Sequence, residues 1–142
     1  MKVCVISLDI QENPEVNRNL IKQQILAYPG SDLYVLPEYM TTGFPAPLEF
    51  AEQMSGPTVQ LLQYLSALLN VAICGSLLIQ ENGFYFNRLL FVYNSTFTII
   101  KQLFMIKFTF SPPGTSTQIQ KVVQNAFSSP SKTQNSSSKS AT

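Results

Sequence analysis

The residue best suited to chemistry in this sequence is Glu38, which follows the second of its apolar strand-like runs. That run ends at Pro37, a stiff residue, and the carboxylate comes directly afterwards. Open α/β sheets carry their reactive groups just beyond the carboxyl ends of strands, where Glu38 is expected to lie. Neighbouring Tyr34, Tyr39 and Phe44 are expected to shield it from water, which makes Glu38 a candidate general base. The alternative interpretation is an ordinary solvated loop glutamate.

The first half of the chain predicts the strands and helices that would hold this carboxylate. Residues 2–9 are apolar and β-branched, which indicates a strand buried on both faces. Asn13 and Pro14 then supply a cap and a first helical residue for a helix over residues 14–27. Residues 33–36 form the next strand, so a β-α-β unit with a right-handed crossover is expected. The buried stripe of the helix is predicted to contain Val16, Leu20, Ile21 and Ile25.

The following segments continue the same alternation. After a loop-rich insert over residues 39–56, a helix starts near Pro57 and presents Leu61, Leu65, Leu68 and Leu69 on one face. A strand over residues 71–79 is joined to an antiparallel strand over residues 84–93 by Asn82-Gly83, a pair typical of hairpin turns. The sequence therefore predicts one α/β domain with β-α-β-α-β-β order.

Beyond Tyr93 the pattern changes. Residues 94–110 are rich in Ile, Phe and Thr without a clear period, and residues 94–127 are interpreted as an out-of-frame segment. Residues 128–142 are Ser-rich and contain no large apolar side chain, which predicts a disordered tail. The first 81 residues hold three basic and eight acidic side chains, whereas the following 61 hold six basic and no acidic ones. These cations form no stripe or stacking platform, so nucleic acid is not an expected partner.

Composition excludes several classes of site. The chain has no histidine, which excludes Ser-His-Asp catalysis, Cys-His catalysis and histidine-ligated metals. Its two cysteines, Cys4 and Cys74, lie in strand-like runs and fit buried thiols in a reducing compartment. No run of apolar residues is long enough to cross a membrane, so a cytoplasmic protein is expected.

Several short motifs together resemble the carbon–nitrogen hydrolase (nitrilase-like) superfamily over residues 1–93. These are Leu36-Pro37-Glu38, Thr42-Gly43-Phe44, Gly75-Ser76 and Tyr85-Phe86-Asn87-Arg88-Leu89. Three further segments resemble the omega-amidase branch, namely Ala51-Glu52, Ser55-Gly56-Pro57-Thr58 and Glu81-Asn82-Gly83. The resemblance implies the N-terminal part of an α-β-β-α sandwich, followed by the tail described above.

The resemblance also implies a Glu-Lys-Cys mechanism that uses no cofactor or metal. Glu38 matches the general base, and Lys101 matches the oxyanion-stabilising lysine, with Lys107 as its rival. No cysteine follows Cys74, so the nucleophile is missing. Cys74 itself is either a substitute nucleophile or an inert core thiol, and the absence of an adjacent cation favours the second.

Two functions follow from these residues. In the first, the chain is a truncated and inactive amidase whose family acts on small linear amides and forms homo-oligomers. In the second, it is a non-catalytic α/β module used for binding or assembly. Cysteine-dependent release of ammonia from a small amide would contradict the first, and a defined oligomer with a cooperative melting transition would support the second.

Overall fold

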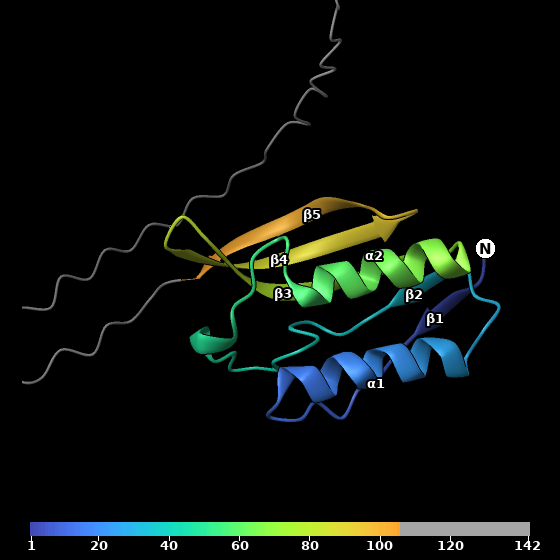
Figure 1. Ribbon diagram of the computed structural model, residues 1–142, viewed down its shortest axis with the longest axis horizontal. Coiled ribbons are helices and arrows are strands. Elements are labelled where there is room, and N and C mark those ends of the chain that lie inside the picture. Colours follow the sequence, from blue (N-terminus) through green and yellow to red (C-terminus); the bar gives the residue numbers. More distant parts are fainter. Residues whose placement is uncertain (106–142) are drawn as a thin grey trace, which may run out of the picture.

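Five strands form one mixed sheet in the spatial order β1-β2-β3-β4-β5 (Figure 1). The structure is a computed structural model, and it describes residues 1–105. The first three strands are parallel, and the last two are antiparallel to their neighbours. Their bounds are β1 (Val3–Val5), β2 (Leu33–Val35), β3 (Ala72–Glu81), β4 (Phe84–Tyr93) and β5 (Thr96–Met105). The mixed α/β sheet predicted from the sequence is confirmed.

Two α-helices connect the parallel strands. Helix α1 (Pro14–Ala27) begins after Asn13, whose side chain accepts a hydrogen bond from the Glu15 amide at 2.9 Å. Pro14 occupies the first helical turn, where its missing N–H costs nothing. Helix α2 (Pro57–Leu69) ends at Asn70, which adopts a left-handed conformation with φ 53°. A short 3-10 helix, η1 (Leu48–Phe50), interrupts the loop before α2.

Both helices cover the same face of the sheet and lie beside each other (Figure 1). The apolar core between helices and sheet joins Ile21 and Ile25 of α1, Leu62 and Leu65 of α2, and Ile73 of β3. This packing corrects parts of the two predicted helix stripes. Val16 and Leu68 are exposed, and the buried stripes are Asn17, Ile21 and Ile25 in α1 and Val59, Leu62 and Leu65 in α2.

The first strand is not buried on both faces, as the sequence had predicted. Val3 and Val5 are exposed, Val5 to 76%. The reason is that β1 is an edge strand of a sheet that helices cover on one side only, within the part of the chain that the structure describes. A run of apolar residues indicates a strand, but its neighbours decide which faces it buries.

The segment without a clear period contains an additional strand, β5. Asn94 and Ser95 adopt φ angles of 48° and 63°, the conformation of a two-residue hairpin turn, and β5 then pairs with β4 from Tyr93 to Tyr85. Large apolar side chains of β5 are exposed, including Ile99, Ile100 and Leu103. Because this edge strand is not buried on a single face, its sequence shows no alternation.

Some predictions fall outside residues 1–105. They are the rival lysine Lys107, the part of the segment 94–127 that follows β5, and the tail over residues 128–142. Within residues 1–105, neither α1 nor α2 combines the length and the apolar character of a membrane-spanning helix.

Candidate active site

Strand β3 fixes the backbone on both sides of Glu38, just past the end of β2. The Leu36 amide donates to the Cys74 carbonyl at 2.7 Å. The Tyr39 amide donates to the Ser76 hydroxyl oxygen at 2.9 Å, and the Met40 amide donates to the Ser76 carbonyl at 3.0 Å. These bonds flank Pro37, which has no N–H to donate. The carboxylate therefore projects from a turn anchored to the neighbouring strand.

Close packing at this turn requires the glycine of the Gly-Ser pair. A Cβ atom on Gly75 would lie 2.6 Å from the Met40 methyl carbon and 2.8 Å from the Leu36 Cβ atom. The flexible Met40 side chain could move aside, but the Leu36 Cβ atom is attached to the backbone, so a side chain at position 75 would require the backbone of this turn to shift. Gly75 thus lets the loop that carries Glu38 approach β3 closely.

The carboxylate of Glu38 is held by an amide from β4. The Asn87 side-chain nitrogen donates to Glu38 Oε1 at 2.7 Å, and Asn87 is only 7% exposed. The two residues are 49 positions apart in the chain. The other amide atom of Asn87, Oδ1, is buried and has no hydrogen-bond partner among the residues that the structure describes.

A small cavity of about 210 Å³ lies beside this pair. Polar groups and leucine side chains line it together: Leu36, Glu38, Ser76, Asn87, Leu89, Lys101 and Leu103. Leu90 and Val92 of β4 enter the core under the helices, so the alternating positions Asn87 and Leu89 belong to the opposite face. The cavity is therefore on the face of the sheet that α1 and α2 leave uncovered.

The structure brings together the two residues that the sequence singled out. Lys101 pairs with Leu89 across β4 and β5 and lines the same cavity as Glu38. Cys74, the alternative nucleophile, is not a lining residue of this cavity, and burial raises the pKa of its thiol. A raised pKa lowers the thiolate fraction near neutral pH, which fits an inert thiol.

The shielding of Glu38 predicted from neighbouring aromatic residues is wrong. Glu38 is exposed, because two of the three rings point elsewhere. Tyr34 is buried in the core under the helices, and Phe44 is 84% exposed. Tyr39 is buried, and its burial, together with the nearby charge of Glu38, raises the pKa of its phenol.

Sequence reasoning missed the roles of Ser76 and Asn87. Both belong to segments that carried the family resemblance, yet the sequence did not predict which groups they would contact. Their signal was the presence of a polar residue inside a strand that is otherwise apolar. Only the register of β3 and β4, in which Leu78 pairs with Asn87, shows that they meet the turn after β2.

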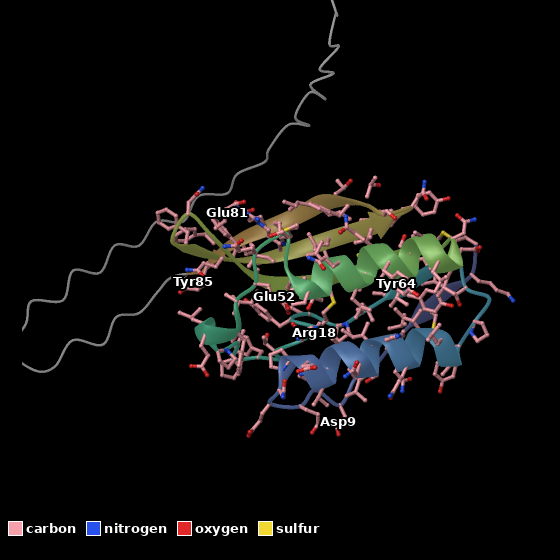
Figure 2. The ribbon with its side chains drawn as sticks, viewed as in Figure 1. Asp9, Arg18, Glu52, Tyr64, Glu81 and Tyr85 are labelled. Carbon is pink, nitrogen blue, oxygen red and sulfur yellow. The ribbon has the colours of Figure 1, made fainter. Side chains whose placement is uncertain are left out.

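Two further polar side chains fix the segments around this turn. Asn17 of α1, fully buried, donates to the carbonyl oxygens of Gln11 and Thr41 at 2.7 and 2.8 Å. Glu52 accepts from the Thr58 amide at 2.9 Å and from Arg18 at 3.3 Å. Figure 2 shows Arg18 and Glu52 between α1 and the start of α2. Among residues 1–105, no group of three His, Cys, Asp or Glu side chains is arranged to hold a metal ion.

The fold and the cavity together define an α/β protein with a carboxylate and an amine at one site beyond the end of a parallel strand. The family model for carbon-nitrogen hydrolases matches residues 3–120. The chain therefore belongs to the carbon–nitrogen hydrolase family. The match continues past Tyr93, where the resemblance seen in the sequence ended.

Solved structures of this superfamily share the fold. A carbon–nitrogen hydrolase superfamily protein from Xanthomonas campestris is 30% identical, with a TM-score of 0.64 over 73% of this chain and 40% of that one. A carbon–nitrogen hydrolase from Helicobacter pylori G27 is 17% identical, with a TM-score of 0.59 over 75% of this chain and 40% of that one.

An N-terminal amidase shows the same fold at 18% identity, with a TM-score of 0.58 over 77% of this chain and 28% of that one. The chain thus spans well under half the length of these solved structures. A comparison with curated proteins gives no significant match.

Proposed function

We propose that this chain carries the proton acceptor and the oxyanion-stabilising cation of an amidase that acts on small linear amides. The observation that supports this most strongly is that Glu38 and Lys101 line one cavity, although Glu38 comes from the turn after β2 and Lys101 comes from β5. We assign the substrate to the omega-amidase type, a monoamide of a short dicarboxylic acid, on the motifs that resemble that branch. Two free cysteines support a reducing compartment, which we take to be the cytoplasm.

The proposed chemistry uses three groups. Glu38 accepts the proton of a thiol, and the thiolate sulfur attacks the amide carbon. Negative charge then develops on the amide oxygen, where the ammonium group of Lys101 stabilises it. The nitrogen leaves as ammonia with the proton returned by Glu38, and water releases the acid from the thioester. The sequence contains no cysteine after Cys74, so we propose that the chain alone does not complete the first step.

The experiment tests binding and turnover separately with the full 142-residue chain. A small linear monoamide is titrated in while backbone amide signals are followed by NMR, and ammonia is measured in parallel. We expect shifts at Asn87, Leu89 and Leu103, weaker binding in Glu38→Gln and Lys101→Gln, and no ammonia above the buffer blank.

The matched control is Lys22→Gln, which removes an exposed lysine from α1. This variant should bind the amide as the unchanged chain does. Shifts scattered away from the cavity, or equal weakening by Lys22→Gln, would contradict the proposed site. Ammonia release that disappears in Cys74→Ser would contradict the proposed inactivity and make Cys74 the nucleophile.

The second candidate function, a binding or assembly module, has an observation of its own. Val3, Val5 and Leu103 are exposed on strands of the sheet that the helices cover on one side only. Val3 and Val5 lie on one edge strand of this sheet and Leu103 lies on the other. Exposed apolar side chains on an uncovered sheet are typical of a protein interface, and we propose a homo-oligomer formed through these strands. Sedimentation of the full chain would show a defined dimer or higher oligomer, and Val5→Lys would dissociate it. A monodisperse monomer would reject this function.

A further inference from the structure

The buried amide of Asn87 has no place in the chemistry proposed above. Its nitrogen donates to Glu38 Oε1 at 2.7 Å, while Oδ1 is buried without a partner among residues 1–105. Buried amide oxygens are normally paired, because an unpaired one loses its bond to water and gains nothing. An exception beside a candidate general base calls for a physical reason.

The reason lies in the chemistry of the two groups. An ionised carboxylate has only acceptor atoms, whereas an asparagine amide has both a donor and an acceptor. Facing Glu38, Asn87 must therefore present its nitrogen, and the same choice turns Oδ1 away. A hydrogen bond to a charged acceptor is stronger than one between neutral groups, which offsets the unpaired oxygen. The orientation of Asn87 is thus dictated by Glu38.

We infer that Asn87 is a positioning residue that fixes the carboxylate of Glu38 in one orientation. This inference rests on the proposed function, in which Glu38 takes the thiol proton. With Oε1 occupied by Asn87, Oε2 is the oxygen left to accept that proton. Ser76 holds the backbone directly after Glu38, so main chain and side chain are fixed by different neighbouring strands.

Such positioning matters because Glu38 is exposed. A glutamate side chain has three rotatable bonds, and an exposed one samples several rotamers. A general base works only within hydrogen-bond reach of the proton it takes, about 2.6–3.2 Å. Misplacement by about 1 Å costs on the order of 100-fold in rate, so a group that selects one rotamer contributes directly to catalysis.

The first measurement is the rotamer distribution of Glu38 in the full 142-residue chain, from three-bond NMR couplings of its side chain. We expect one dominant rotamer in the unchanged chain. Asn87→Asp keeps the size and shape of the side chain but removes the donor, so Glu38 should average over several rotamers. The matched control is Gln102→Leu, which removes the 2.6 Å bond from Arg88 on the opposite face of β4. It should leave the Glu38 couplings unchanged.

The second measurement is a double-mutant cycle on the unfolding equilibrium with Asn87→Ala, Glu38→Ala and the double variant. A charge-assisted bond predicts a coupling of about tenfold or more in the equilibrium constant. If Asn87→Asp does not fold, Glu38→Ala tests the same contact from the other side, because exchange of the Asn87 amide protons with water should then accelerate.

The inference is overturned if Glu38 already averages over rotamers in the unchanged chain, if Gln102→Leu has the same effect as Asn87→Asp, or if the coupling is below about twofold. None of these measurements uses an amide. A locked Glu38 with no amide binding at the cavity would leave the positioning intact and reject the proposed function. A Glu38 that averages over several rotamers, together with amide binding at the cavity, would reject the positioning by Asn87 and leave the proposed function intact.

Discussion

The side-chain nitrogen of Asn17 in α1 donates to the carbonyl oxygen of Thr41, three residues past Glu38, across 2.8 Å. The same amide also donates to the Gln11 carbonyl and accepts from the Gln11 amide, both at 2.7 Å. One fully buried side chain therefore joins the loop before α1 to the loop after β2. The candidate base is held from the helix layer as well as from the sheet.

Replacing Asn17 should destabilise the fold strongly. Asn17→Leu leaves the Gln11 amide and the Gln11 and Thr41 carbonyls without their partner, and we expect a loss of about 2–4 kcal/mol in the free energy of unfolding. Asn19→Leu, an exposed position in the same helix, is the matched control and should change this free energy by less than about 0.5 kcal/mol. Urea unfolding followed by circular dichroism measures both. Equal losses in the two variants would show that the contacts of Asn17 carry little stability.

Glu52 should act as the capping group of α2. The N-cap position is Gly56, which has no side chain, and Glu52 instead accepts from the Thr58 amide at 2.9 Å. We expect Glu52→Ala to lower the free energy of unfolding by about 1–2 kcal/mol, as for loss of a helix cap. Glu49→Ala removes an exposed carboxylate nearby and should be close to neutral. A thermal melt of each variant makes the comparison, and an equal effect of Arg18→Ala alone would assign the stability to the ion pair instead.

The ion pair of Glu81 and Arg88 predicts a pH dependence of stability. Its hydrogen bond from Arg88 is the main reason that the pKa of the Glu81 carboxyl is lowered from 4.5. Because the folded state holds this proton less tightly than the unfolded state, the pair stabilises the fold above about pH 4.5. That contribution is lost as the pH falls through the lower folded value.

Glu81 is 49% exposed on its side chain, so water screens the pair and its effect should stay below about 1 kcal/mol. Urea unfolding of the unchanged chain and of Glu81→Gln, repeated between pH 3 and pH 6, measures the difference in their free energies of unfolding at each pH. The unchanged chain should lose stability relative to the variant toward acid. A constant difference across this range would contradict the shift.

Cys74 should behave as an unreactive thiol. Burial raises its pKa, so its thiolate fraction at neutral pH is smaller than that of a free cysteine. In a Cys4→Ser background, alkylation of Cys74 by iodoacetamide should be at least several-fold slower in the folded chain than in urea. Mass spectrometry over time gives both rates. Rapid labelling of the folded chain would reopen Cys74 as a nucleophile.

Local sequence signals predicted the local structure well. Asn13 and Pro14 placed the start of α1, and Asn82-Gly83 placed the turn between β3 and β4, where both residues adopt positive φ. These signals act within a few residues, so they do not depend on the rest of the fold. The Asn94-Ser95 turn that opens β5 is a weaker form of the same signal, because Ser lacks the freedom of Gly at positive φ.

By itself the sequence determined the alternation of strands and helices, the family, and Glu38 as the candidate base, because caps, turns and motifs are written in neighbouring residues. For the cation it offered both Lys101 and Lys107. Tertiary structure alone decided that Val5 is exposed, that Asn17 replaces Val16 in the buried stripe of α1, and that Asn87 meets Glu38. Each of these depends on which strands become neighbours and which face the helices cover. Those are contacts between segments far apart in the chain, and no local pattern specifies them.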